Sequence, residues 1–205
     1  MMKKLLIATT NPGKLAEISM FLSDSPIRLI GLKEAGITDR VEETGKTFEE
    51  NAILKATFYA KKSGLPAIAD DGGFEIDALG GEPGVKSHRW IHGDREDTDE
   101  ELISYTIERL RGIPLPDRGA QLRAVVALAL PDGTTHTSED MIRGVIPLKP
   151  TSTRTPGFPF RSLLYLPQLG KFYNFDVLST EENEAYNHRK KALEALKPII
   201  RKYLI

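Results

Sequence analysis

The segment that decides the fold is GLPAIADDGGFEIDA, residues 64–78. Its apolar start predicts a buried strand that ends at two adjacent carboxylates, Asp70 and Asp71, where two glycines turn the chain. Side chains alternate along a strand, so these two carboxylates are expected on opposite faces of the sheet. The alternation that follows assigns one side to Phe74, Ile76 and Ala78 and the other side to Glu75 and Asp77.

Two interpretations of this segment remain open. A carboxylate at a strand end beside a flexible turn is suited to holding a divalent cation. The alternative is a hairpin whose turn contains Asp and Gly because turns favour these residues. From this segment alone, the turn interpretation is favoured.

The composition narrows the class of protein. The chain has 205 residues, with 40% hydrophobic and 28% charged residues, as expected for one ordinary globular domain spanning residues 1–205, or two lobes sharing a core. A formal net charge of −1 argues against a nucleic-acid or membrane-surface partner. The absence of cysteine excludes disulfides, thiolate zinc sites and cysteine nucleophiles. No apolar run approaches the ~20 residues of a membrane span. These features predict a cytoplasmic protein.

Residues 4–14 predict a strand, a polar loop and the start of a helix. The strand covers residues 4–9, the loop reads TTNPGK, and apolar residues then recur at helical spacing at Leu15, Ile18, Phe21 and Leu22. A helix start after a strand presents free backbone N–H groups to an anion, and Lys14 adds a positive charge there. The alternative is an ordinary strand-to-helix turn with an exposed lysine.

The segment TFEE, residues 47–50, matches a helix capping box. It predicts a helix over residues 48–63 that ends at Gly64. Glu50 then has two interpretations, as the cap of its own helix or as a metal ligand facing Asp70 and Asp71. Both stay open on the local sequence.

The rest of the chain predicts further elements in order. A strand is expected at residues 27–32, a helix from Asp97 or Thr98 to about Gly112, strands at residues 122–130, 134–138 and 141–148, and a rigid aromatic loop at residues 155–161. Residues 86–89 group donors that could bind phosphate, and the alternative there is a solvated basic turn. A final capping box at residues 179–182 begins a helix that runs through Ile200, with Pro198 interrupting it late. His188 on this helix is expected to be a core histidine.

Taken together, these motifs resemble the inosine-triphosphate pyrophosphatase family of house-cleaning enzymes. The resemblance rests on residues 9–14 (TTNPGK), 44–52 (TGKTFEENA), 69–73 (ADDGG), 77–85 (DALGGEPGV), 87–90 (SHRW) and the pair His188-Arg189. Each motif is weak alone, but their order and spacing cover nearly the whole chain. We therefore expect the family's properties here.

The resemblance implies a fold, a reaction and a partner. The fold would be α/β, elongated and two-lobed, with a long mixed β-sheet flanked by helices and a central nucleotide cleft. The enzyme would be a homodimer that uses Mg²⁺ to hydrolyse a nucleoside triphosphate to the monophosphate and pyrophosphate. The favoured substrates would be deaminated purine nucleotides such as ITP, dITP and XTP.

The resemblance also assigns roles to residues. Asp71 would be the general base and, with Glu50, a metal ligand. Because Asp70 is expected on the opposite face of the strand, we expect it to have a structural role or to support a residue of the site. The substrate would be bound by Thr9, Thr10, Asn11, Lys14, Gly72, Phe158, Arg161, Asn183, His188 and Arg189. A metal-assisted water attacking the α-phosphorus requires a nearby base and stabilisation of the phosphate charge, which these residue types can supply.

Departures from the family pattern gather around the expected nucleobase pocket. Gly72 stands where the family usually has Ser, Arg161 where it has Asp, and Asn183 where it has Lys. Asn187 likewise replaces the usual Ser before His188. We therefore predict an altered or relaxed base preference with an intact catalytic half.

Two other functions are considered. One is a nucleotide-binding paralogue with weak or no catalysis that acts as a sensor or partner, although both carboxylates are retained. The other is the related Maf-type branch, which acts on pyrimidine nucleotides. Residues 9–14 do not match its Ser-x-Ser-Pro-Arg-Arg opening, so this branch is disfavoured.

Overall fold

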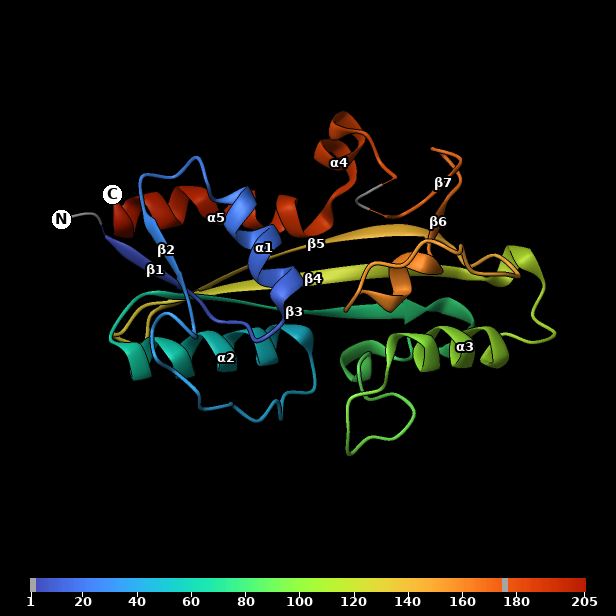
Figure 1. Cartoon of the computed structure of the whole chain (residues 1–205), viewed down its shortest axis with the longest axis horizontal. Coiled ribbons are helices and arrows are strands. Elements are labelled where there is room, and N and C mark those ends of the chain that lie inside the picture. Colours follow the sequence, from blue (N-terminus) through green and yellow to red (C-terminus); the bar gives the residue numbers. More distant parts are fainter. Residues whose placement is uncertain (1–2, 175–176) are drawn as a thin grey trace. The chain divides into compact units, whose positions relative to one another are not determined.

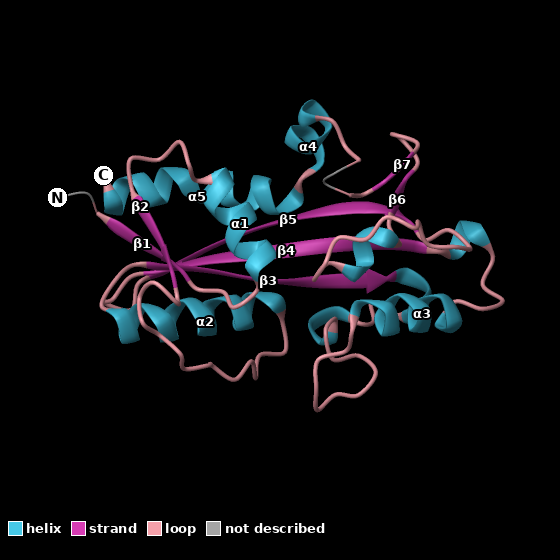
Figure 2. Ribbon diagram, in the orientation of Figure 1, coloured by secondary structure: helices cyan, strands magenta, loops and turns pink. Residues whose placement is uncertain are grey.

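The structure is a computed structural model that describes residues 3–174 and 177–205. Its strands are β1 (Lys4–Ile7), β2 (Arg28–Gly31), β3 (Ala67–Ile76), β4 (Gly119–Ala129), β5 (Thr135–Val145), β6 (Tyr165–Leu166) and β7 (Lys171–Phe172) (Figures 1 and 2). Its α-helices are α1 (Pro12–Phe21), α2 (Phe48–Ser63), α3 (Asp99–Arg109), α4 (Thr180–Tyr186) and α5 (His188–Leu204). Four short 3₁₀ helices are η1 (Asp77–Leu79), η2 (Gly84–Lys86), η3 (Leu115–Asp117) and η4 (Pro159–Ser162).

The described strands form one mixed sheet of seven strands, in the order β2-β1-β3-β4-β5-β6-β7. The strand β1 pairs in parallel with β2 and with β3, with Leu6 opposite Ala67 in the second pairing. At the other edge, β6 pairs antiparallel with β5 and with β7. A mixed sheet flanked by helices confirms the predicted α/β class.

The chain divides into two compact units. Unit 1 comprises Met1–Asp71, Ala124–Asp140 and His188–Ile205, and unit 2 comprises Gly72–Arg123 and Met141–Asn187. The strands β3, β4 and β5 each contribute residues to both units. The elongated shape, the central cleft and the single-domain organisation stay predictions.

Unit 1 has a hydrophobic core on each face of its strands. On one face, α1 and α5 pack on Leu5, Ile7 and Ile68. On the other face, α2 packs on Leu6, Ala67 and Ala69, so that odd and even positions of one strand enter different cores (Figure 1). This two-sided burial explains why β1 and the start of β3 are apolar throughout.

Unit 2 has a single core in which α3 covers the strands. Leu102, Ile103 and Leu110 of α3 join Phe74 and Ile76 of β3 there. The Phe74 ring stacks on Phe160, with 4.7 Å between the ring centroids. Phe74 and Ile76 enter one core, so the common side predicted for them is confirmed, whereas Ala78 lies in η1, outside the strand, and is exposed.

Three boundaries expected from the sequence are wrong. Gly72 and Gly73 do not turn the chain, because β3 runs through them and neither has a positive φ. The strands expected at residues 134–138 and 141–148 are the single strand β5, which has the same length as its neighbour β4. The last helix is broken at Asn187, whose ψ of 102° is extended, and Pro198 instead lies inside α5.

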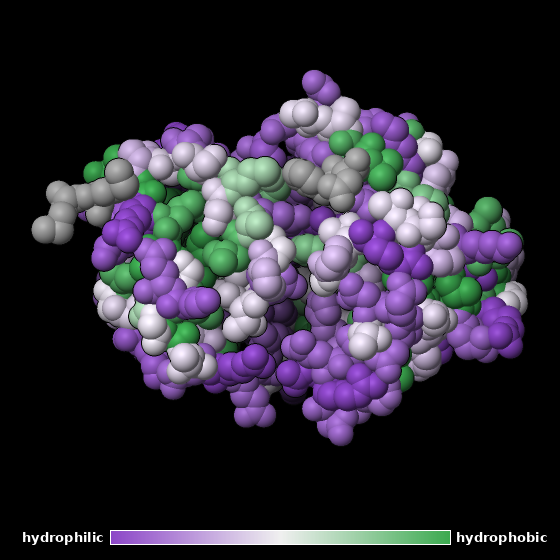
Figure 3. Space-filling model, in the orientation of Figure 1, coloured by the Kyte–Doolittle hydropathy of each residue, from purple (hydrophilic) through white to green (hydrophobic). Residues whose placement is uncertain are grey.

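No helix among the described residues is long and apolar enough to span a bilayer. Hydrophilic residues cover most of the face seen in Figure 3, with hydrophobic residues in scattered patches between them.

Candidate functional site

The loop before α1 is organised by Asn11. Its side-chain oxygen caps the helix by accepting hydrogen bonds from the backbone N–H groups of Gly13, at 2.8 Å, and Lys14, at 3.1 Å. Pro12 has no N–H, and the Asn11 N–H donates to Thr9 Oγ1 at 3.2 Å. The N–H groups of the first helical turn, at Gly13 and Lys14, are therefore bonded to the cap, and the Lys14 side chain supplies the positive charge for an anion at this loop.

Lys14 reaches from the start of α1 to Asp70 on β3. Lys14 Nζ lies 3.1 Å from Asp70 Oδ2, and Arg189 Nε of α5 lies 3.1 Å from the same oxygen. The side chain of Asp70 is fully buried and that of Lys14 is 13% exposed. The second oxygen, Asp70 Oδ1, is buried and has no hydrogen-bond partner among the described residues.

Asp71 faces the opposite side of the sheet, toward α2. Its Oδ1 accepts a hydrogen bond from Lys55 Nζ at 2.8 Å, and Glu43 Oε1 lies 3.3 Å from the same nitrogen. Two carboxylates thus gather around one buried ammonium group. The opposite directions predicted for Asp70 and Asp71 are confirmed by their different partners.

The two neighbouring carboxyls have pKa shifts of opposite sign. Burial would raise the pKa of Asp70, but the charges of Lys14, Arg189 and Lys55 together hold it well below its usual range. For Asp71, burial outweighs the nearby lysines, so its pKa is raised. Burial would lower the pKa of Lys55, but the attraction of Asp71 and Glu43 is stronger and raises it. Asp71 is therefore the stronger proton acceptor of the two aspartates.

Glu50 caps α2 as the capping box predicts. Its Oε2 accepts hydrogen bonds from the N–H groups of Lys46, at 2.5 Å, and Thr47, at 3.3 Å. The loop before the helix is further fixed by Gly45, whose N–H donates to Asn51 Oδ1 at 2.8 Å. Since both capping bonds use one oxygen of Glu50, its capping role and a role as a metal ligand are compatible.

The residues expected at the nucleobase lie in unit 2. The guanidinium of Arg161 lies 4.0 Å from the centroid of the Phe158 ring and 5.7 Å from that of Tyr173, and its side chain is buried. Asn183 Nδ2 donates to the backbone oxygens of Leu178 and Ser179. Arg161 therefore stacks on aromatic rings, as a guanidinium does in a cation–π contact.

The predicted site residues divide between the two units. Unit 1 contains Thr9, Thr10, Asn11, Lys14, Glu50, Asp71, His188 and Arg189, and unit 2 contains Gly72, Phe158, Arg161 and Asn183. Contacts join Asn11 to Lys14 and Phe158 to Arg161, and Asp70 joins Lys14 to Arg189. His188 is buried at the first position of α5, as expected of a core histidine.

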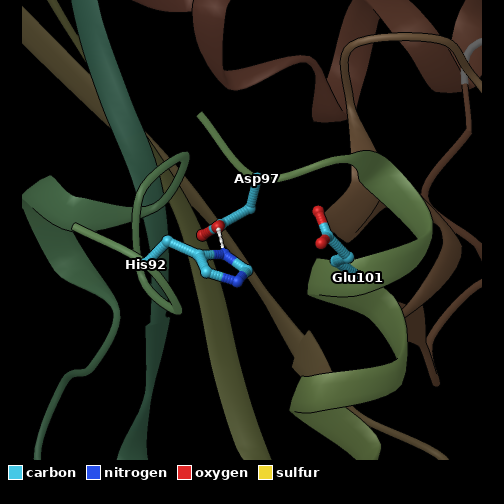
Figure 4. Close-up of side chains that lie close together, drawn as sticks. All are labelled: His92, Asp97 and Glu101. Atoms are coloured by element: carbon cyan, nitrogen blue, oxygen red, sulfur yellow. Dashed lines mark hydrogen bonds and ion pairs between the residues drawn. The ribbon is translucent and has the colours of Figure 1, made fainter. Parts of the chain in front are cut away.

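Unit 2 contains another group of metal-ligand residue types, His92, Asp97 and Glu101 (Figure 4). His92 Nδ1 lies 2.6 Å from Asp97 Oδ1, and Arg95 Nη2 lies 2.7 Å from Glu101 Oε1. Glu101 also accepts the Thr98 N–H at 2.7 Å as part of the capping box of α3. Arg95 already supplies a positive charge to these carboxylates. The cluster of His92, Asp97 and Glu101 is therefore explained as an ion-pair network, without a metal ion.

Three charged residues of unit 1 were not assigned a role from the sequence. Lys55, Glu43 and Glu17 contact Asp71, Lys55 and Arg189, respectively. Lys55 lies on the buried side of α2, and a buried lysine is rare without a partner. The position of Lys55 on this side of the predicted helix could therefore have indicated a buried ion pair. Glu43 and Glu17 are identified only by their tertiary contacts.

Comparison with known sequences gives matches over nearly the whole chain. The Ham1 family matches residues 5–199. A dITP/XTP pyrophosphatase of Thermus thermophilus is 44% identical over 193 residues, covering 94% of this chain and 89% of the relative. The dITP/XTP pyrophosphatase of Streptomyces avermitilis is 41% identical over 207 residues, covering 99% of this chain and 100% of the relative.

Comparison with solved structures gives the same result. A HAM1 protein from Coxiella burnetii matches with a TM-score of 0.84 and 34% identity, covering 98% of this chain and 100% of the other. The Ham1 protein of Staphylococcus aureus matches with a TM-score of 0.82 and 33% identity, over 98% and 100% of the two chains. Together with the ordered motifs, these matches confirm the predicted resemblance, and the chain belongs to the Ham1 family.

Proposed function

We propose that this protein hydrolyses nucleoside triphosphates with deaminated purine bases, such as dITP and XTP, to the monophosphate and pyrophosphate. The observation that carries the proposal is the arrangement in unit 1, where adjacent aspartates on opposite faces of β3 contact Lys14 and Lys55. Full-length relatives named dITP/XTP pyrophosphatase support the substrate class. The chemistry is that of an acid-anhydride hydrolase.

The carboxylates of unit 1 are suited to Mg²⁺. Asp71 and Glu43 provide oxygen ligands, which Mg²⁺ prefers, and Lys55 contacts one oxygen of each carboxylate, Oδ1 of Asp71 and Oε1 of Glu43. Glu50 is a further oxygen donor at the start of α2. We propose Asp71 as the central ligand, with Glu43 and Glu50 as candidates for the second. When bound, Mg²⁺ neutralises phosphate oxygens and lowers the pKa of a water ligand.

The residues of the chain then have separate tasks. Lys14 would bind the phosphates, since its ammonium is a point charge on a flexible stem near a capped loop. Asp71 would accept the proton of the water whose oxygen attacks the α-phosphorus, and the bond from this phosphorus to the pyrophosphate oxygen breaks. A raised pKa favours this proton transfer because it brings the carboxyl closer to the pH of the cell.

The test is the release of pyrophosphate from ITP, dITP, XTP, GTP and ATP in the presence of Mg²⁺. We expect turnover, and we expect Asp71→Asn to lower kcat by about 10²-fold or more, the usual contribution of a general base. Asn matches Asp in size, so thermal unfolding of the variant checks that it is folded. Folded wild-type protein that binds nucleotide without releasing pyrophosphate would instead indicate a sensor or partner protein.

We also propose, from the resemblance, a homodimer in which the nucleobase contacts residues of unit 2. The buried Arg161, stacked on Phe158, supports a base site that differs from that of the relatives. Sedimentation analysis of the full chain tests the oligomeric state.

A further inference from the structure

The contacts of Arg189 in unit 1 do not involve Asp70 alone. Its Nε lies 3.1 Å from Asp70 Oδ2, while its Nη1 donates to Glu17 Oε2. The guanidinium thus bridges two carboxylates, one on β3 and one on α1. All three side chains are buried, with exposed fractions of 6% for Arg189, 0% for Asp70 and 11% for Glu17. A buried ion network of this kind is rigid when each member is satisfied.

Lys14 joins the same network through its contact with Asp70. Lys14 and Glu17 are three residues apart on α1, so their side chains leave the same face of the helix. Among the described residues, the ammonium of Lys14 pairs with the Asp70 carboxylate, at 3.1 Å, through a flexible four-carbon stem. In this network the planar guanidinium of Arg189 contacts two carboxylates, those of Asp70 and Glu17, whereas the ammonium of Lys14 contacts Asp70.

The different contacts of Arg189 and Lys14 have a consequence for the binding of an anion to Lys14. Phosphate that binds Lys14 competes with Asp70 for the N–H donors of its ammonium group, and weakening the pairing of a buried carboxylate is unfavourable. Arg189 bonds to the same Asp70 oxygen and stays in place through Glu17, so Asp70 keeps a cation after Lys14 leaves. We infer that Glu17 and Arg189 are positioning residues that hold Asp70 and thereby allow Lys14 to transfer to the triphosphate.

The inference rests on the proposed function only in taking triphosphate as the anion. It differs from the role that the resemblance assigns to Arg189, which is direct binding of substrate. The two roles predict opposite effects of removing Glu17. As a positioning residue, Arg189 would hold Asp70 less well, Asp70 would hold Lys14 more tightly, and the anion would bind more weakly. As a direct ligand, Arg189 would be released toward the anion, and binding would be unchanged or tighter.

The experiment compares Glu17→Ala, Glu17→Gln and Asp24→Ala with the wild type. Gln keeps a side-chain oxygen that can accept from Arg189, so it serves as the conservative variant. Asp24→Ala removes another ion pair to α5, with Lys197 at 3.0 Å, that is away from Asp70. For each protein, KM and kcat with ITP and the Kd of inorganic tripolyphosphate are measured. Thermal unfolding verifies that each variant is folded, and Glu17→Asp replaces Glu17→Ala if the latter is not.

We expect Glu17→Ala to raise KM and the Kd of tripolyphosphate by about tenfold, a usual coupling within one ion-pair network. We expect kcat to stay within about twofold, since Asp71 on the other face is untouched. Glu17→Gln is expected to restore most of the affinity and Asp24→Ala to change neither constant. An unchanged or lower Kd in Glu17→Ala, or an equal rise in Asp24→Ala, would overturn the inference.

Failure of the inference and failure of the proposed function give different results. If wild-type protein releases no pyrophosphate but Glu17→Ala still weakens tripolyphosphate binding, the function is wrong and the positioning role stands. If the wild type turns over ITP and the Kd of Glu17→Ala equals that of the wild type, the positioning role is wrong and the function stands.

Discussion

At the scale of single residues, the sharpest contrast lies between Asp70 and Asp71. One peptide bond separates them, yet the pKa of the first is lowered by two cations at one oxygen and that of the second is raised by burial. A carboxyl with a lowered pKa stays charged and anchors lysine, whereas a carboxyl with a raised pKa accepts protons more readily. The environments of the two side chains therefore suit them to different tasks.

The second metal ligand can be identified with two neutral variants. Glu50→Gln keeps the capping box, because Gln also fills its third helical position, but removes the charge. Glu43→Gln removes the charge beside Lys55 without affecting a helix cap. We expect the variant of the true ligand to need at least about tenfold more Mg²⁺ for half-maximal activity.

The readout is the dependence of pyrophosphate release on Mg²⁺ concentration, at saturating nucleotide. Thermal unfolding without metal should be nearly unchanged in both variants. Equal Mg²⁺ requirements for the wild type and both variants would refute a role for either residue.

Arg161 is expected to influence the choice of base. A guanidinium only donates hydrogen bonds, so it matches the 6-oxo group of hypoxanthine and xanthine and not the 6-amino group of adenine. Arg161→Met keeps an unbranched side chain that can pack against Phe158 while removing the guanidinium and its donors. We expect the ratio of kcat/KM for ITP to that for ATP to fall by about tenfold or more, since unpaired polar groups discriminate strongly.

The selectivity profile of the variant is compared with that of the wild type on the same nucleotides. Asn183→Ala is measured beside it, as a variant of a second residue expected near the base. Asn183 Nδ2 donates to the backbone oxygens of Leu178 and Ser179 in unit 2. A ratio that is unchanged in Arg161→Met would place Arg161 in the packing of unit 2 only.

At the scale of secondary-structure elements, the start of α2 contacts the preceding loop through Gly45 and is capped by Thr47 and Glu50. A methyl group built on Gly45 would lie 2.5 Å from Asn51 Oδ1 and 2.8 Å from Glu50 Cβ. Gly45 therefore has to lack a side chain for the loop to approach the helix. This close approach fixes the loop that carries Glu43 next to the helix that carries Lys55.

We expect Gly45→Ala to destabilise the protein by about 1–3 kcal/mol, the usual effect of forcing extra atoms into a packed place. Chemical denaturation measures this change. Gly31→Ala in β2 is the matched control, since its added carbon would meet only Leu15 at 3.4 Å, an ordinary contact. Equal stability of both variants would contradict the close approach.

The local sequence predicted the elements with strong end signals. Thr47 and Glu50 at one end and Gly64 at the other gave α2 its correct bounds, because capping is decided by neighbouring residues. The turn predicted at Gly72 and Gly73 is wrong, because glycine favours turns in the local sequence whereas these two residues lie within the strand β3. In the site, the opposite faces of Asp70 and Asp71 followed from strand geometry. The contacts of Glu17 and Glu43 depend on residues distant in the sequence, so no local pattern could reveal them.

At the scale of the whole molecule, acid stability should depend on Asp70. Its pKa is lowered on folding, so it contributes stability above the pKa of the unfolded chain, about 3.9. That contribution is lost as the pH falls through the lower, folded pKa. We expect Asp70→Asn to be less stable than the wild type at pH 7, with the difference shrinking below about pH 4.

Urea unfolding at pH 7, 5 and 3.5 without metal measures this difference. Asp24→Asn is the comparison, because Asp24 is exposed although its pKa is also lowered, by Lys197. We expect a much smaller effect there, since solvent screens exposed pairs. A difference for Asp70→Asn that is constant over the pH range would contradict the ion network.

The strand β3 has one more consequence, which concerns insertions and deletions. Since the faces alternate at every residue, deleting one residue among residues 67–69 would reverse the direction of each following side chain relative to β1. Asp70, the partner of Lys14, would then face α2, and Asp71, the partner of Lys55, would face α1 and α5. The length of this strand is therefore as strictly constrained as its aspartates, and a single-codon deletion here should abolish activity even though it removes only an alanine or an isoleucine.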